Sequence, residues 1–487
     1  MNLLTLTAFV SVTAMGLAAE SNVVLDWNAL MLDAIRLDDT GPTLGSRNLA
    51  ILHAAIYDAV NSVERTHQPY RLELDAPLGT SAAAAAVAAG YEVMLALYPP
   101  LRARTDALYE SCVATAPANE ALTNGLALGQ AVAREMLAWR SADGSSTDVP
   151  YSPSDAPGQW RRTPPFFRPP LTPQWRYVTL FCLTDIEPFV APGPPPMDSA
   201  DYAESFNQVK AIGEKNSTIR TAEQSEIAAF WSDFSYTLMP PGHWHEIAAV
   251  IARQRHNSLA ETARLFALIS LAQADAAIVC WEAKYRFNLW RPVTAIQRAD
   301  EDGNPATEKD ARWEQFLPSP PFPEYPSGHS TFSKASAQVI THFYGTDEIS
   351  FSAASDTLPG VTRSFTSLAV CADEVGMSRI YGGFHFMFAN RDGKASGQKV
   401  GDYVARNFLL PNDHLPLVLL ENLTPGTPLL RVQGHLGVRC VLEASPDLAH
   451  WQAISTNVSV AGGVVIADTP AVDRVMRFYR AVEPGAP

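Results

Sequence analysis

Three short segments, far apart in the chain, carry the side chains that a small oxyanion requires. Guanidinium and ammonium groups neutralise an anion, and the planar arginine fork binds two oxygens at once. Histidines nearby can move protons close to neutral pH. The combined set fits one trigonal or tetrahedral oxyanion and comprises Lys284, Arg291, Ser327, Gly328, His329, Arg379 and His385.

The first segment reads KYRFNLWRP and contains Lys284 and Arg291. If the segment is helical, seven residues make nearly two turns, which places both cations on one face about 10 Å apart. Pro292 ends or kinks such a helix and disfavours the helical conformation at Arg291. Two cations on a buried apolar helix are costly unless they are paired, so ion pairs with core carboxylates are the alternative interpretation.

The second segment, PSGHS, is expected at a junction between a loop and a helix. Ser327 is a natural N-cap, and Gly328 lets an anion approach the backbone N–H groups closely. A helix N-terminus presents free N–H donors and the positive end of the dipole. His329 would lie beside the bound anion as a proton donor or acceptor. A capped helix start with a structural histidine is the alternative.

The third segment, SRIYGGFH, runs from Ser378 to His385. Arg379 offers a planar fork for an oxyanion. Gly382 and Gly383 permit a tight turn that could direct His385 to the same site, where a neutral ring nitrogen serves as nucleophile or metal ligand. A surface arginine and a packed histidine are the alternative interpretation.

The order KX6RP, PSGH, SRX5H resembles the signature shared by vanadium-dependent haloperoxidases and type-2 phosphatidic acid phosphatases. The stretches LDWNALMLDAI and SRNLAILHAAIYDAV are also similar to bacterial members of the haloperoxidase branch. The resemblance implies an all-α bundle around the oxyanion site and vanadate as cofactor. It further implies a peroxidase-type oxidoreductase that oxidises halide with hydrogen peroxide to hypohalous acid, which halogenates an organic acceptor.

The resemblance also implies a role for each motif residue. His385 would bind vanadium directly, and His329 would be the acid–base group for peroxide. The vanadate oxygens would be held by Lys284, Arg291, Ser327, the Gly328 N–H and Arg379. Trp281 and Phe322 resemble residues that line the halide side in chloroperoxidase-like members. Asp233, in FWSDF, resembles the carboxylate that pairs with the arginine of the third segment.

One position departs from the family pattern. Many relatives carry Asp four residues after the metal-binding histidine, and Ala389 stands there in this chain. The tautomer of His385 therefore lacks its usual orienting group, for which Asn390 or Asp392 could substitute. The loss counts against the first alternative function, a phosphomonoesterase with a phosphohistidine intermediate. The second alternative is a non-catalytic secreted binding protein in which a C-terminal β-module does the binding.

Composition excludes several classes of protein. The formal charge of −15 disfavours nucleic-acid binding. Residues 1–19 form an apolar stretch typical of a signal peptide, although no Lys or Arg precedes Arg36, so a secreted or periplasmic location is expected. No other run suits a membrane span. The five cysteines are far apart, which disfavours a zinc site and leaves one or two disulfides possible. The oligomeric state stays open, with a homodimer as one option.

Apolar periodicity predicts a mainly α catalytic domain over 20–412 and a small β-sandwich over 417–487. A Pro-rich excursion at 142–197 is expected to be an irregular surface loop or a lid-like cover. The predicted helices cover 24–66 with a break at Gly41-Pro42, 81–98, 118–141, 199–213, 221–232, 244–290, 328–344, 362–380 and 393–408.

Overall fold

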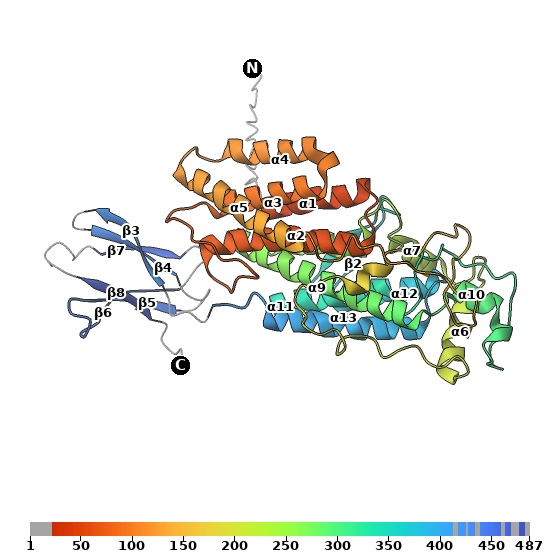
Figure 1. The fold of residues 1–487 in the computed structure, drawn as a ribbon. Coiled ribbons are helices and arrows are strands. Elements are labelled where there is room, and N and C mark those ends of the chain that lie inside the picture. The colour runs from red at the N-terminus through yellow and green to blue at the C-terminus, as the bar shows by residue number, and fades with distance from the viewer. Residues whose placement is uncertain are drawn as a thin grey trace, which may run out of the picture.

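The structure is a computed structural model, in which a helical body is followed by a small β-module (Figure 1). It describes residues 22–412, 417–424, 427–433, 439–458, 463–468 and 477–482. The segment expected to be a signal peptide, 1–19, lies outside the described residues, as do parts of 417–487. Export and the two domain boundaries therefore stay predictions.

Helix α9 (Leu259–Phe287) is the central element of the helical body. It is apolar nearly all round and buried along most of its length, as the sequence predicts. Ser258 and Glu261 form a capping box at its start. Helices α2 (Pro42–Glu64), α11 (Gly328–Tyr344) and α13 (Met387–Asn407) pack against it. Among the described residues, α9 is the one helix long and apolar enough for a membrane span, and it is enclosed by the other helices.

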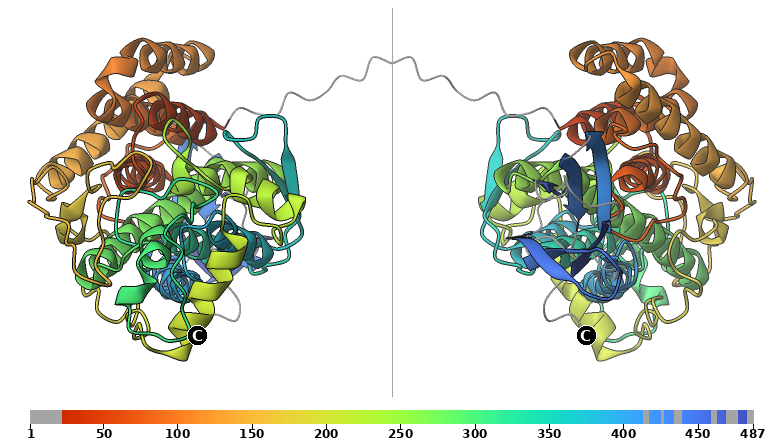
Figure 2. Two further views of the ribbon diagram at one scale, coloured as in Figure 1. Left: turned by 90° about the vertical axis from the view of Figure 1, so that its right-hand side faces the viewer. Right: turned by 90° about the vertical axis from the view of Figure 1, so that its left-hand side faces the viewer.

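The N-terminal helices form a second layer beside α2 (Figure 2). They are α1 (Val23–Leu37), α3 (Ala82–Leu97), α4 (Arg102–Thr115) and α5 (Glu120–Arg140). Helices α3 and α5 approach so closely that a Cβ on Gly129 would lie 2.0 Å from the carbonyl oxygen of Ala85. Helix α4 was not expected, because its mixed polar sequence buries only Thr105 and shows no clear apolar face.

Two predicted helices are divided or shortened. The region predicted as one helix over 244–290 contains α8 (Met239–Gln254), a turn, and α9, which ends at Phe287. The segment predicted as helix over 362–380 begins with strand β2 (Thr362–Phe365), which pairs with β1 (Phe351–Ala354). Its helix, α12 (Leu368–Tyr381), begins only after the Ser367 cap. The remaining helices are α6 (Ala200–Ile212), α7 (Ala222–Phe230) and α10 (Pro292–Gln297).

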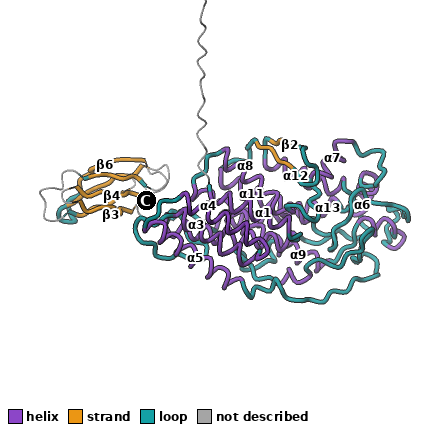
Figure 3. Tube along the Cα trace, turned by 90° about the horizontal axis from the view of Figure 1, so that it is seen from above, coloured by secondary structure: helices purple, strands orange, loops and turns teal. Residues whose placement is uncertain are grey.

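The C-terminal module consists of two three-stranded antiparallel sheets, ordered β3-β4-β7 and β6-β5-β8. Figure 3 shows the strands of this module in orange, beside the helical body. The strands are β3 (Leu417–Thr424), β4 (Thr427–Gln433), β5 (Arg439–Ser445), β6 (Gln452–Val458), β7 (Val464–Ala467) and β8 (Phe478–Val482). Leu430 and Val432 of one sheet share a small core with Leu442 and Ala481 of the other. This arrangement is the β-sandwich that the predicted fold class contains.

The Pro-rich segment 142–197 is irregular apart from a short 3-10 turn at Pro173–Tyr177. It is nevertheless fixed to the core, because buried Asp275 of α9 accepts N–H bonds from Phe181, Cys182 and Leu183 at 2.7–2.8 Å. The segment is thus held on the body and not free of it. No disulfide joins any of the four cysteines of the helical body, which are Cys112, Cys182, Cys280 and Cys371.

Candidate active site

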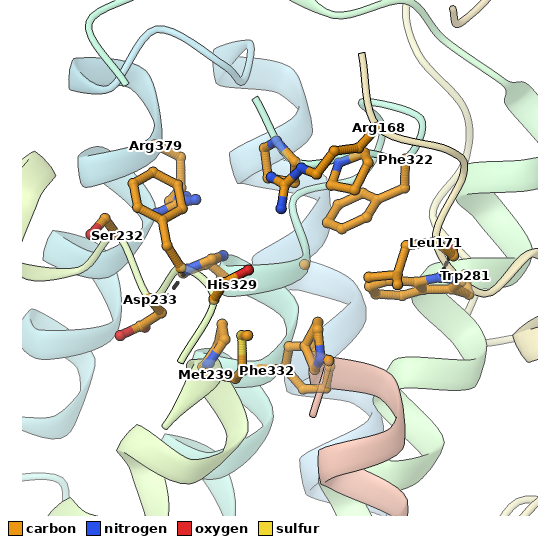
Figure 4. A pocket seen from close by; sticks show the side chains of 18 of the residues that line it. Arg168, Leu171, Ser232, Asp233, Met239, Trp281, Phe322, His329, Phe332 and Arg379 are labelled. Carbon is orange, nitrogen blue, oxygen red and sulfur yellow. Dashed lines mark hydrogen bonds and ion pairs between the residues drawn. The ribbon is translucent and has the colours of Figure 1, made fainter. Parts of the chain in front are cut away.

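A cavity of about 240 Å³ lies near the C-terminal end of α9 and the N-terminus of α11. Gly328 and His329 of the second motif segment and Arg379 and His385 of the third line it. Lys284, Arg291 and Ser327 do not line the cavity and are buried behind these residues. Figure 4 shows Arg379, Ser232 and Asp233 on one side of it, and Trp281, Leu171 and Phe322 on the other. His329 lies between the two groups. One wall is therefore polar and the opposite wall apolar, which suits an anion bound beside a less polar molecule.

Lys284 lies in the last turn of α9 with no exposed surface. Its ammonium donates to the carbonyl oxygens of Pro323 (3.0 Å), Glu324 (3.1 Å) and Pro326. Burial, together with the charge of Arg291, lowers the pKa of Lys284 to about 7. All three donors are thus engaged by one loop, 323–326, which Lys284 holds in place directly before Ser327.

Arg291 is fully buried but does not belong to the helix of Lys284. The helix ends because Asn288 is left-handed (φ 50°), and Arg291 is extended before Pro292 at the start of α10. The expectation that both cations share one helical face is therefore wrong. Arg291 donates from Nε to the carbonyl of Phe322 (3.0 Å) and from Nη1 to that of Phe384 (2.9 Å) and to Nε2 of His385 (3.1 Å).

His385 is oriented by Glu324. Its Nδ1 lies 2.8 Å from Oε1 of Glu324, which also accepts the backbone N–H of Phe386 at 2.8 Å. The carboxylate fixes the tautomer with the proton on Nδ1, so Nε2 carries the lone pair. Burial and the charge of Arg291 hold the pKa of His385 well below its usual value, which keeps the ring neutral. Burial raises the pKa of Glu324 to about 7.

The two residues considered as substitutes for the missing aspartate have other partners. Asn390 accepts a hydrogen bond from the Ser330 hydroxyl, and Asp392 accepts one from the hydroxyl of Tyr325, each at 2.8 Å. Neither interaction involves His385, so the proposal that one of them orients this ring is wrong. The orienting carboxylate comes instead from the loop that precedes the second motif.

Ser327 and Gly328 begin α11 as expected. The Ser327 side chain accepts the N–H of Ser330 at 3.4 Å as the N-cap, and its oxygen also accepts the Ser330 hydroxyl at 2.8 Å. The single hydroxyl proton of Ser330 also faces Oδ1 of Asn390 at 2.8 Å, so it serves only one of these two oxygens at a time. Gly328 lines the cavity, and a Cβ there would lie 3.7 Å from the Trp281 ring and 4.0 Å from Cε of Lys284.

His329 lines the cavity with its Nε2 atom 3.7 Å from Oδ2 of Asp233. Burial and the nearby charge of Arg379 hold the pKa of His329 well below its usual value. The other carboxylate oxygen, Oδ1, lies 3.1 Å from Nδ1 of His243 in α8. Despite burial, the charge of Asp233 raises the pKa of His243. Asp233 thus connects two histidines.

Arg379 lies in the last turn of α12 with no exposed surface. Its Nη1 donates to the carbonyl of Trp231 at 2.8 Å, and its guanidinium stacks over the ring of Phe384 at 4.1 Å. Burial lowers the pKa of Arg379, while the charge of Asp233 opposes this. Although the charges interact, the direct pairing expected between these two side chains is absent, because Asp233 is bonded to His243 instead.

Trp281 and Phe322 form the apolar wall, with ring centroids 5.0 Å apart. The Lys284 ammonium lies 4.9 Å from the centre of the Phe322 ring, and the Arg291 guanidinium lies 5.1 Å from the same ring centre. Both aromatic residues therefore border the cationic cluster. Their role toward a halide stays a prediction.

The residues present fit a bound oxyanion. Nη2 of Arg291 and Nε of Arg379 are buried donors without a hydrogen-bond partner among the described residues. A buried cationic donor without a partner is costly, so both donors are available to an anion. The described residues contain no cluster of three or more His, Cys, Asp and Glu placed to hold a bare metal ion.

Comparisons with known proteins agree with this fit. Residues 264–410, which hold all three motif segments, match the model of the VCPO second helical-bundle domain. Vanadium chloroperoxidase of Curvularia inaequalis is 27% identical over 409 residues, a match that spans 66% of each chain. A bacterial vanadium-dependent iodoperoxidase superposes with a TM-score of 0.71 at 28% identity, covering 81% of this chain and 98% of that one.

A bacterial vanadium-dependent chloroperoxidase shares the fold, with a TM-score of 0.60 at 18% identity over 75% of this chain and 92% of that one. By sequence and fold, the chain is thus a relative of the vanadium-dependent haloperoxidases. The chain matches only about two thirds of the length of the curated relative.

The sequence interpretation missed Glu324 and His243. Glu324 stands alone among prolines and aromatics in FPEYPSGH, and an acid in so apolar a segment was the available signal. His243, in PPGHW, carries no such signal, because its link to the site passes through Asp233 and becomes visible only in the folded chain.

Proposed function

We propose that this protein is a vanadate-dependent haloperoxidase. The observation that carries the proposal is the pair of unpartnered buried guanidinium donors, on Arg291 and Arg379, beside a neutral histidine with its lone pair on Nε2. In the overall reaction, hydrogen peroxide, halide and one proton yield hypohalous acid and water. Vanadate, when bound, would supply the Lewis-acidic centre at which peroxide is activated.

The residues of the chain would hold and charge this site. His385 would bind the vanadium through Nε2, in place of the hydrogen bond that this atom accepts from Nη1 of Arg291, with Glu324 fixing the orientation of the ring. Arg291 and Arg379 would take the oxygens, with the Ser327 hydroxyl and the Gly328 N–H as further donors. Lys284 would act by Coulombic attraction and by holding the loop 323–326, since its three donors contact carbonyl oxygens.

His329 would be the proton acceptor for the incoming peroxide. A lowered pKa keeps its ring neutral, and therefore able to accept a proton, at physiological pH. Asp233, 3.7 Å away, would stabilise the imidazolium that forms. Trp281 and Phe322 would border the halide on the apolar side.

The deciding experiment is bromination of a phenolic dye by apoprotein with peroxide and bromide, with and without orthovanadate. Activity that requires vanadate and is suppressed by excess phosphate supports the proposal. A chain that folds and binds vanadate yet halogenates nothing with chloride, bromide or iodide would contradict it. The rates measured with chloride, bromide and iodide would also rank the halides, because Trp281 and Phe322 alone do not determine which halide is preferred.

A phosphomonoesterase is the second candidate, and one observation favours it. Glu324 supplies the orienting carboxylate whose absence at Ala389 had counted against a nucleophilic His385. Turnover of nitrophenyl phosphate by vanadate-free protein would support this function, and its absence, in protein that binds phosphate, would exclude it.

A further inference from the structure

The cavity is larger than the inorganic reactants require. It measures about 240 Å³, whereas an engineered apolar cavity of about 150 Å³ holds benzene and one water occupies about 30 Å³ in the liquid. The oxyanion shares this space, because His329, Arg379 and His385 line it too, and a ring of the size of benzene would leave about 90 Å³ for the oxyanion, peroxide and halide. The cavity has room for one substituted aromatic ring beside the oxyanion.

The chemistry of the walls also suits an organic ring. Apolar side chains from five separate segments line the cavity, namely Leu171, Met239, Trp281, Phe322 and Phe332. Flat and aliphatic side chains of this kind bury a ring by contact and by aromatic stacking.

A further cation, Arg168, lines the same cavity. Figure 4 shows its side chain reaching from the Pro-rich segment over the cavity, toward the space between Arg379 and Phe322. It is partly buried, and its one recorded contact is the ring of Phe166 at 5.8 Å. Among the described residues, no acid forms an ion pair with it, and Asp39, the other carboxylate on the cavity besides Asp233, accepts the N–H of Tyr236.

The segment that carries Arg168 is fixed in position. Its Leu171 carbonyl accepts bonds from Nε1 of Trp281 (3.3 Å) and the hydroxyl of Tyr285 (2.8 Å), and its Leu171 N–H donates to Pro321 (2.8 Å). It is bracketed by two non-glycine residues in the left-handed conformation, Phe167 (φ 46°) and Thr172 (φ 49°). Such conformations persist where the surroundings enforce them and gather at ligand sites.

We propose that this cavity binds an aromatic organic acid as the halogen acceptor, with Arg168 binding its carboxylate. The inference rests on the proposed function. In the reaction, the ring would exchange a C–H bond for a carbon–halogen bond, and the hypohalous oxygen would leave with the ring proton as water. The carboxylate at Arg168 would direct the ring toward the apolar wall, next to the oxyanion.

The test is a binding measurement that needs neither vanadate nor peroxide. Calorimetric titrations would compare 4-hydroxyphenylacetate with its neutral amide, 4-hydroxyphenylacetamide, on vanadate-free full-length protein in excess orthophosphate. The phosphate occupies the oxyanion cage, so that the probe cannot bind there. The variant is Arg168→Gln, and the matched control is Arg162→Gln, an exposed arginine of the same loop that does not line the cavity.

We expect Arg168→Gln to weaken binding of the carboxylate about tenfold, as loss of a charge-assisted hydrogen bond does, and to leave the amide and the Arg162→Gln control unchanged. Equal weakening of both probes, an unchanged affinity for the carboxylate, or no binding of either probe to the native chain would overturn the proposal. Binding of the carboxylate only in a parallel titration without phosphate would also overturn it, because the probe would then occupy the cage. None of these outcomes bears on halide oxidation, which the dye assay tests separately.

Discussion

Replacement of Glu324 by glutamine tests the assignment of His385 most directly. Glutamine keeps the size of the side chain and an acceptor oxygen, so the 2.8 Å bonds from Nδ1 of His385 and from the N–H of Phe386 can persist. What is lost is the charge. A hydrogen bond to a charged group contributes about 1 kcal/mol more than a neutral one. Only the bond to His385 strengthens when Nε2 donates to vanadium, so we expect a loss of about 1 kcal/mol, or about fivefold in vanadate affinity.

The assay is calorimetric titration of vanadate-free protein with orthovanadate at pH 8. Burial raises the pKa of Glu324 to about 7, so the carboxylate is charged at pH 8. The difference in vanadate affinity between the native chain and the variant should therefore narrow as the pH falls through about 7. Glu314→Gln is the matched control, because Glu314 is an exposed glutamate paired with Lys215. Native affinity in a folded Glu324→Gln variant at pH 8 would refute the reasoning.

Four further predictions concern stability and binding. Burial lowers the pKa of His245 to about 4, below its unfolded value, so the unfolded chain binds the proton first as the pH falls from about 6.5, and this group should cost about 2 kcal/mol of stability between pH 7 and pH 5; the gap in urea-unfolding free energy between the native chain and His245→Gln should change by that amount between the two pH values, and a constant gap would contradict this. Gly328→Ala should fold, since its Cβ meets only ordinary contacts, yet lose about tenfold in vanadate affinity by crowding the anion; native affinity would show that the anion does not lie close to the backbone N–H of Gly328. Asp275→Asn replaces one of the two carboxylate oxygens that accept bonds from three backbone N–H groups, so we expect about 2–4 kcal/mol less stability and faster amide exchange at 181–183; unchanged exchange at these amides would disprove this. A chain ending after residue 412 retains the bridge between His67 and Pro411 and should keep its halogenating activity and thermal midpoint; loss of either would show that the β-module supports the catalytic body.

The motif residues could be predicted from the sequence because each local segment constrains its own chemistry. Ser327 and Gly328 mark a capped helix start in any fold, and that start is present. The buried central helix followed from an uninterrupted apolar run. The resemblance then supplied what the spacing could not, namely that these segments converge.

The errors arise where a contact joins distant segments. Arg291 leaves the helix because a single residue, Asn288, turns left-handed, and asparagine is permitted there but does not require it. Asp233 prefers His243, and Glu324 reaches His385 across 61 positions of the chain. No periodicity encodes such pairs. Strand β2 was mistaken for helix because four residues are too few to establish an alternation.

Because Lys284 binds the loop 323–326, the energetic contributions of several site residues depend on one another. One ammonium fixes the backbone that carries Glu324, and this backbone leads directly into Ser327. A change at Lys284 therefore displaces the partner of His385 and the first donor of α11 together. Double-mutant cycles between Lys284 and Glu324 would yield a large interaction energy, and a substitution at Lys284 would report more than the contribution of Lys284 itself.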